Sequence, residues 1–181
     1  MTNIKNSKKF SYSAVFLISI VFVFSLFSPN ALAESISTPT EDVKSVVVVE
    51  ASGLMDPVMV RMMQRTLEEV DTTKTIALVF QINISGSVVE EEKIVALGKA
   101  ISSSPIPISF WIGPSGSRAK GPITELALIS GDIGISPGSK IGKIGQSILS
   151  SNSSEAHKNF DLNEKTFNYE EAVEKGIARS S

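Results

Sequence analysis

Two serines and a lysine stand close together in residues 114–121, which read Pro-Ser-Gly-Ser-Arg-Ala-Lys-Gly. A serine hydroxyl can attack a carbonyl carbon when a base takes its proton and backbone amides bind the oxyanion that forms. Within this segment Ser117 is the candidate nucleophile. The candidate bases are Lys120 of the same segment and Lys158, which lies farther along the chain. The single histidine, His157, lies in a polar, serine-rich stretch, and we interpret it as a solvent-exposed loop residue rather than the base of a Ser-His-Asp triad.

Four further segments accompany this octet along the chain. They are Asn83-Ile-Ser-Gly-Ser87, Ser104-Pro-Ile-Pro107 with the apolar run to Ile112, Ser136-Pro-Gly-Ser-Lys-Ile-Gly142, and Asn168–Ile177. Together with the octet they resemble the motifs of ClpP-class serine proteases, in particular the membrane-associated NfeD-like branch related to signal-peptide peptidase A. The resemblance covers roughly residues 45–178. It implies an α/β fold of the ClpP/crotonase-like type, a ββα superhelix with a largely parallel sheet.

The resemblance also implies roles for individual positions. Aligned without a gap, the nucleophile position of the family falls on Gly121, which has no side chain. The next residue, whose amide helps to bind the oxyanion in the family, is Pro122, and proline has no N–H to donate. Gly86, Ser87 and Gly116 correspond to the glycine-rich loops that bind the oxyanion and the substrate. The resemblance therefore predicts a protease framework whose catalytic site is silent.

The base of this branch is a lysine on a helix that follows the Pro-Gly-x-x-Ile-Gly segment. Burial lowers the pKa of such a lysine, so that it can accept the serine proton. Here only about 25 residues separate Gly142 from Asn168, so most of this helix is expected to be missing. By position Lys158 and Lys165 are the candidates, and neither lies in an apolar pattern, which indicates ordinary surface lysines.

The first 33 residues are typical of a secretory signal peptide. Three lysines precede an apolar run of 14 residues, Ala14–Phe27, and Ala31-Leu-Ala33 offers the small residues that a signal peptidase reads. We expect cleavage before Glu34 and an extracytoplasmic location. The alternative is an uncleaved membrane anchor, although the run is shorter than the ~20 apolar residues that a bilayer span needs. Cleavage leaves a polar linker at 34–44 and one domain at 45–181.

Composition excludes several classes of function. The formal net charge of −2 provides no basic patch, which argues against nucleic acid as a partner. The chain has no cysteine and therefore neither a disulfide nor thiol chemistry. Its one histidine has no metal-ligating neighbours, and we expect no metal or other cofactor. The acidic triplet Glu90–Glu92 begins a predicted helix, where negative charge complements the helix dipole, so we interpret it as a solvated helix start.

Short apolar runs alternate with helical patterns in the predicted domain. The predicted strands span residues 46–49, 75–80 and 106–112, and the predicted helices run from Asp56 to Val70, from Ser87 to Ser102 and from Pro122 to at least Ser130. Apolar runs without alternation are typical of strands buried on both faces of a sheet. The methionines of the first helix form one stripe, which indicates ordinary core packing. This order of elements favours β-α-β crossovers and a parallel sheet.

Three hypotheses about function follow. The first is an exported, catalytically silent homologue of the NfeD-like endopeptidases that acts as a binding or assembly module. Its partner would be a peptide or a membrane-protein segment, with self-association into a homo-oligomer by analogy. The second is an active serine peptidase with a shifted nucleophile, Ser117. The third is a decayed, truncated copy, which the low aromatic content of 7% and the serine-rich residues 147–154 favour. The paired loss at Gly121 and Pro122 favours the first.

Overall fold

A computed structural model of the chain describes residues 44–149 and 160–181, which belong to one compact unit, Glu41–Ser181. The predicted signal peptide at 1–33 and all but the last residue of the predicted linker at 34–44 lie outside the described residues. Among the helices of the described ranges, none combines the length and the apolar character that crossing a membrane requires.

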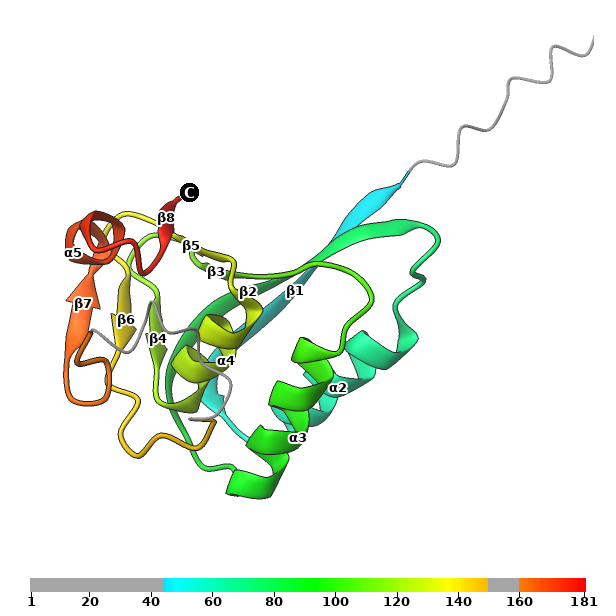
Figure 1. Cartoon of the computed structure of the whole chain (residues 1–181), viewed down its shortest axis with the longest axis horizontal. Helices are drawn as coiled ribbons and strands as arrows, with labels where there is room; N and C mark the ends of the chain where they lie inside the picture. The colour runs from blue at the N-terminus through cyan, green and yellow to red at the C-terminus, as the bar shows by residue number, and fades with distance from the viewer. Residues whose placement is uncertain (1–43, 150–159) are drawn as a thin grey trace, which may run out of the picture. The chain divides into compact units, whose positions relative to one another are not determined.

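From Ser45 to Ile112 strands and helices alternate in the predicted order, and further strands and two more helices follow (Figure 1). The strands are β1 (Ser45–Met55), β2 (Thr75–Ser87), β3 (Ile108–Ile112), β4 (Arg118–Lys120), β5 (Ile133–Ile135), β6 (Lys140–Gly142), β7 (Thr166–Asn168) and β8 (Arg179–Ser180). The helices are α2 (Pro57–Glu69), α3 (Glu91–Ser102), α4 (Pro122–Ser130) and α5 (Tyr169–Glu174).

The strands form one sheet that divides along β2. Its order is β7-β6-β4-β2-β3-β5-β8, and β1 pairs with the other edge of β2. β2 first pairs with β3 through Leu78–Ile82 and then with β4 at Ile84. One branch of the sheet therefore continues through β3, β5 and β8, and the other continues through β4, β6 and β7 (Figure 1). All pairs are parallel except β6–β7, which confirms the predicted largely parallel sheet.

The core lies between the sheet and the helices α2, α3 and α4. In Figure 1 these helices lie on the same side of β2, and α3 packs against both α2 and α4. Phe80 of β2 and Phe110 of β3 are fully buried, and their ring centroids are 5.4 Å apart. Burying such large apolar side chains on one face of the sheet is the main stabilising contribution to the fold.

Helix α2 begins as its sequence predicts. Oδ1 of Asp56 accepts a hydrogen bond from the backbone N–H of Met59 at 2.8 Å, and Pro57 occupies the first turn. Val60 and Met63 are buried against the core, and Met59 and Met62 are partly buried beside them. The methionine stripe thus packs as a core-facing stripe, as predicted.

Helix α3 starts later than predicted. The sequence placed its beginning at Ser87, but β2 extends through Ser87, which pairs with Met55 of β1. The N–H of Val88 continues this pairing by donating to the carbonyl of Met55 at 2.9 Å. The helix therefore begins at Glu91, because hydrogen bonds to β1 hold the preceding residues extended.

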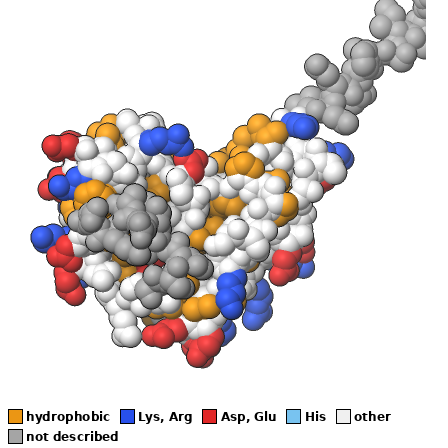
Figure 2. All heavy atoms as spheres, viewed as in Figure 1, with side chains coloured by type: hydrophobic (Ala, Val, Ile, Leu, Met, Phe, Trp, Pro, Cys, Tyr) orange, Lys and Arg blue, Asp and Glu red, His pale blue; other side chains and the backbone are white. Residues whose placement is uncertain are grey.

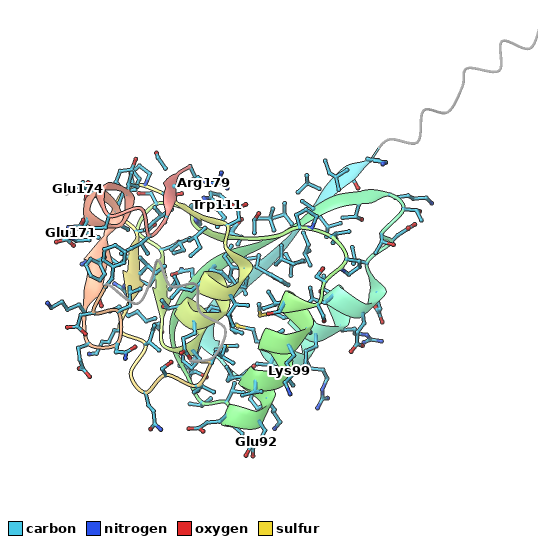
Figure 3. All side chains as sticks on the ribbon, in the orientation of Figure 1. Glu92, Lys99, Trp111, Glu171, Glu174 and Arg179 are labelled. Atoms are coloured by element: carbon cyan, nitrogen blue, oxygen red, sulfur yellow. The ribbon has the colours of Figure 1, made fainter. Side chains whose placement is uncertain are left out.

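The acidic triplet lies at the solvated start of α3, as predicted. Glu90 is the N-cap residue, and its carboxylate lies 2.7 Å from the ammonium of Lys93. The hydrogen bond from Lys93 and its charge hold the pKa of the Glu90 carboxyl below the usual value. Figure 3 shows Glu92 pointing away from the core.

The predicted strand bounds were wrong at three places. β1 extends to Met55 and β2 to Ser87, well beyond the predicted ends at 49 and 80, because the two strands pair with each other over most of their length. β3 starts at Ile108 rather than at residue 106, since Pro107 has no N–H to donate to a neighbouring strand. Its carbonyl instead accepts the N–H of Leu78 at 3.0 Å.

Candidate functional site

The connection from β3 to β4 lies where the sheet divides. It consists of residues 113–117 and packs against the turn at 136–139. Ser115 donates its hydroxyl to the carbonyl of Pro137 at 2.6 Å. The backbone N–H of Ser117 donates to the hydroxyl of Ser139 at 3.1 Å. Two of the segments that carry the family resemblance are therefore joined by hydrogen bonds.

The segment at 83–87 reaches the same place from β2. The N–H of Arg118 donates to Oδ1 of Asn83 at 3.2 Å. Gly86 and Ser87 lie opposite Gly121, because a Cβ atom built on Gly121 would be 3.8 Å from Cα of Gly86 and 3.9 Å from the amide nitrogen of Ser87. A side chain at position 121 would therefore face the end of β2, a strand segment where the sequence motifs predicted a loop. This is the arrangement that a nucleophile and an oxyanion-binding amide require.

Gly121 itself has a backbone conformation that is unfavourable for any other residue. Its φ of 79° and ψ of −152° lie in a region that is essentially restricted to glycine. Its N–H donates to the carbonyl of Lys143 at 3.1 Å, and its carbonyl accepts the N–H of Thr124 at 3.0 Å as α4 begins. Pro122 follows as the first residue of the helix, so no N–H is present there. Position 121 thus carries no nucleophile, and the next position carries no donor.

We expect the change Gly121→Ser to cost stability without creating activity. Serine would have to adopt the glycine-only conformation, at a cost of about 1–3 kcal/mol. Pro122 would still withhold an amide. Urea denaturation and hydrolysis of an apolar peptide would measure the two effects. Gly121→Ala is the matched control, because it imposes the same backbone cost without a hydroxyl. Easily measured hydrolysis by the serine variant would contradict this account of the site.

The candidate substitute nucleophile, Ser117, is buried in the loop. Only 2% of its surface is exposed, and its backbone carbonyl accepts the N–H of Lys140 at 2.9 Å. Gly116 precedes it with a φ of 82°, and a Cβ there would meet no atom within 4 Å. Gly116 therefore serves the tight turn between β3 and β4.

The candidate bases occupy different surroundings. Lys120 is half-buried in β4. Lys165 is an exposed surface lysine, as predicted, with its ammonium 3.7 Å from the carboxylate of Asp161. Lys158 and His157 lie outside the described residues. Within the part of the chain that the structure describes, no group of three or more His, Cys, Asp or Glu side chains could hold a metal ion.

Sequence reasoning missed a buried carboxylate close to this site. Glu125 lies in α4 and is 4% exposed. It accepts hydrogen bonds from the hydroxyl of Ser147 and from the N–H of Ile148 at 3.0 Å. The N–H of Leu149 lies 3.4 Å from the same carboxylate. A single acidic residue in an otherwise apolar helix was the available signal, since a helix that is apolar all round is buried.

A hollow lies beside Trp111 and Arg179, which Figure 3 shows close together. Its polar groups already pair with one another. Asp132 pairs with Arg179 and accepts the hydroxyl of Ser109, and the indole N–H of Trp111 lies 3.0 Å from the hydroxyls of Ser136 and Ser181. These bonds indicate a structural role for the cluster.

Known proteins share this fold at low sequence identity. No protein-family model and no curated protein matches the sequence. Among solved structures, a mutant of the 1510-N membrane-bound stomatin-specific protease aligns with a TM-score of 0.64 and 19% identity, covering 76% of this chain and 79% of that one. The 1510-N membrane protease specific for a stomatin homolog from Pyrococcus horikoshii aligns with a TM-score of 0.64 and 20% identity, covering 76% of this chain and 73% of that one.

Two other groups of structures extend the comparison. ClpP1 from Listeria monocytogenes aligns with a TM-score of 0.55 and 11% identity, covering 75% of this chain and 89% of that one. Human enoyl coenzyme A hydratase domain-containing protein 3 aligns with a TM-score of 0.59 and 12% identity, covering 76% of this chain and 67% of that one. The chain therefore has the ClpP/crotonase-like fold that the sequence motifs predicted.

Proposed function

We propose that this chain is an exported, catalytically silent homologue of the NfeD-like ClpP-class serine endopeptidases, which keeps the protease fold as a binding or assembly module. The observation that carries the proposal is the geometry at Gly121. The position faces Gly86 and Ser87 at the end of β2, yet its own residue has no side chain and a glycine-only conformation. Pro122 removes the adjacent amide. Losing one oxyanion donor alone costs a factor of about 10²–10³ in rate.

An active peptidase with a shifted nucleophile is less well supported. Ser117 is 2% exposed, so a peptide carbonyl has no direct access to its hydroxyl. A serine hydroxyl also needs an adjacent base, and no hydrogen bond joins the Ser117 hydroxyl to a described lysine. Both observations favour the silent site.

A decayed copy is also less well supported. The described residues form a continuous core, and the buried carboxylate of Glu125 is fully hydrogen-bonded. Helix α5 has a complete capping box, in which the side chains of Asn168 and Glu171 each accept the other residue's N–H. Such mutually consistent local features are typical of sequences that specify one fold.

The proposed partner is a peptide or a membrane-protein segment. One similar structure, aligned with a TM-score of 0.62 and 18% identity, is a mutant of the stomatin-specific protease in complex with a substrate peptide. Self-association of the chain is part of the same proposal by analogy of fold alone, and light scattering after size-exclusion chromatography would measure it.

A serine-reactive fluorophosphonate probe tests the silent site directly. We expect the purified full chain to remain unlabelled, because position 121 carries no hydroxyl and the hydroxyl-bearing Ser117 is buried. Intact-mass spectrometry would detect a covalent adduct. The matched control is Ser117→Ala, which removes only the substitute nucleophile. Labelling of the parent chain that disappears in this variant would replace the proposal with the shifted-nucleophile alternative.

A further inference from the structure

The outer edge of β1 is open. Among the described strands, β1 pairs only with β2. Ser45 donates its N–H to the carbonyl of Lys74, and the carbonyl of Met55 accepts from Val88, so these odd-numbered residues direct their peptide groups toward β2. Peptide groups alternate between the two edges of a strand. Those of the even-numbered residues 46–52 therefore face away from β2. Such a row of groups is a template for another strand.

The open edge is also apolar. Val46 and Val48 have 48% and 57% of their surface exposed. The strand carries neither proline nor lysine, the residues that commonly protect a sheet edge. Figure 2 shows hydrophobic side chains gathered over the β1–β2 ribbon. An extended edge of this kind in a folded protein indicates an interaction surface.

Helix α2 provides the second wall beside this edge. An open hollow of about 470 Å³ is lined by Glu50, Ser52, Asp56, Val58, Met59 and Met62. Glu50 and Ser52 belong to the even-numbered set whose peptide groups face outward, which places the hollow along the open edge. Val58, Met59 and Met62 supply an apolar wall. An edge strand beside a helix is the arrangement that accepts an added peptide strand.

The hollow is acidic, which favours an occupant that carries a positive charge. Glu50 forms no hydrogen bond or ion pair with another side chain in the described residues, and Asp56 uses only Oδ1, to cap α2. No Lys or Arg lines the hollow. The lining of the hollow therefore includes two acidic residues beside apolar residues and Ser52, and it includes no basic residue.

We propose that the β1 edge and α2 form a docking groove for an extended peptide strand of another protein, in which a Lys or Arg stands between apolar residues. The strand adds to β1 through its backbone, its apolar side chains contact Met59 and Met62, and its cation pairs with Glu50 and Asp56. This groove is built from residues other than the Gly121 site, so the proposal stands whether or not that site is silent.

A second copy of this chain fits the groove less well. Antiparallel pairing of β1 with β1 of another copy at the level of Glu50 would bring the acidic hollows of the two copies together. Like charges at a buried interface oppose association. A foreign strand that carries a cation avoids this repulsion, so the charge pattern favours a hetero-complex.

Fluorescence anisotropy with labelled peptides tests the groove on the full chain. The probe is the peptide Ser-Val-Thr-Val-Lys-Val-Thr-Val-Ser, and the control peptide carries Glu in place of Lys. We expect the lysine peptide to bind at least about tenfold more tightly, because it places a cation beside two carboxylates. Glu50→Lys should weaken the lysine peptide and strengthen the glutamate peptide.

A second pair of variants tests strand addition. Ser52→Pro removes an outward-facing N–H and places a ring across the edge, whereas Ser52→Ala keeps the N–H. We expect the proline variant to lose about tenfold or more in affinity and the alanine variant to retain binding, with thermal unfolding confirming that both are folded. Equal affinities for the two peptides, or equal binding by the two Ser52 variants, would overturn the proposal. Dimerisation that Ser52→Pro abolishes and the peptide cannot compete with would instead assign the edge to a second copy.

Discussion

The change Gly142→Ala should reduce the free energy of unfolding by about 4 kcal/mol, because it combines backbone strain with a steric clash. Gly142 ends β6 with a φ of 125°. A Cβ there would overlap the carbonyl oxygen of Lys165, which precedes the neighbouring strand β7, and lie 3.1 Å from Cα of Thr166. These are backbone atoms, so β7 must move to make room. The β6–β7 pair is the only antiparallel contact among the described strands, and it would open.

The same change should also disturb the candidate site. Lys143 donates its N–H to the carbonyl of Lys165 at 2.6 Å and accepts the N–H of Gly121 at 3.1 Å. A shift of residues 165–166 is therefore transmitted to position 121 through two consecutive hydrogen bonds. Gly142 thus belongs to the support of the site as well as to the sheet.

Gly145→Ala is the matched control for this prediction. Gly145 also has a positive φ, 80°, but a Cβ there meets no atom within 4 Å. Its replacement should lower the free energy of unfolding only by the cost of a left-handed backbone conformation for alanine, about 1–2 kcal/mol. Urea denaturation of the two variants measures the difference. Equal losses of stability in the two variants would mean that β7 moves aside freely and that the clash contributes nothing.

Local chemistry explains which parts of the fold the sequence could predict. The start of α2 could be predicted from the sequence, because the capping residue Asp56, Pro57 in the first turn and the methionine stripe lie within a few residues of one another. The late start of α3, at Glu91, could not be predicted from the sequence. Ser87 remains in a strand because it pairs with Met55, which lies 32 residues earlier, and no local pattern reports such a contact.

The candidate site likewise combines features that the sequence predicts with features that only the tertiary structure determines. The motifs placed Gly121 at the nucleophile position and Pro122 beside it, and the residue types alone implied the missing groups. The glycine-only conformation of Gly121 and its approach to Ser87 depend on how α4 and β2 meet. The open edge of β1 was hidden for a related reason. A run of valines predicts a strand, but which edge remains unpaired is decided by the topology of the whole sheet.

The second large effect is expected at Glu125, which connects the site helix to residues 147–149. We expect Glu125→Ala to lower the free energy of unfolding by about 3 kcal/mol, because it leaves buried and partly buried donors without an acceptor. The carboxylate accepts the hydroxyl of Ser147 and the N–H of Ile148, and the N–H of Leu149 lies within reach. Leu149 also packs on Gly98 of α3, where a Cβ would be 3.2 Å from its side chain. Losing the carboxylate therefore weakens the contact between α4 and α3.

Two further variants separate the hydrogen bonds from the packing of the side chain. Glu125→Gln keeps the shape of the side chain and one acceptor oxygen, but its amide NH2 replaces the other oxygen and faces the backbone N–H groups as a second donor. We therefore expect the free energy of unfolding to fall by about 1–2 kcal/mol. Ser147→Ala removes one donor and leaves the carboxylate bonded to the backbone, so its effect should be about 1 kcal/mol or less. Urea denaturation gives the three values, and amide exchange at Ile148 and Leu149 reports the segment itself. An alanine variant that unfolds within about 0.5 kcal/mol of the parent chain would show that water replaces the carboxylate and that α4 does not depend on Glu125.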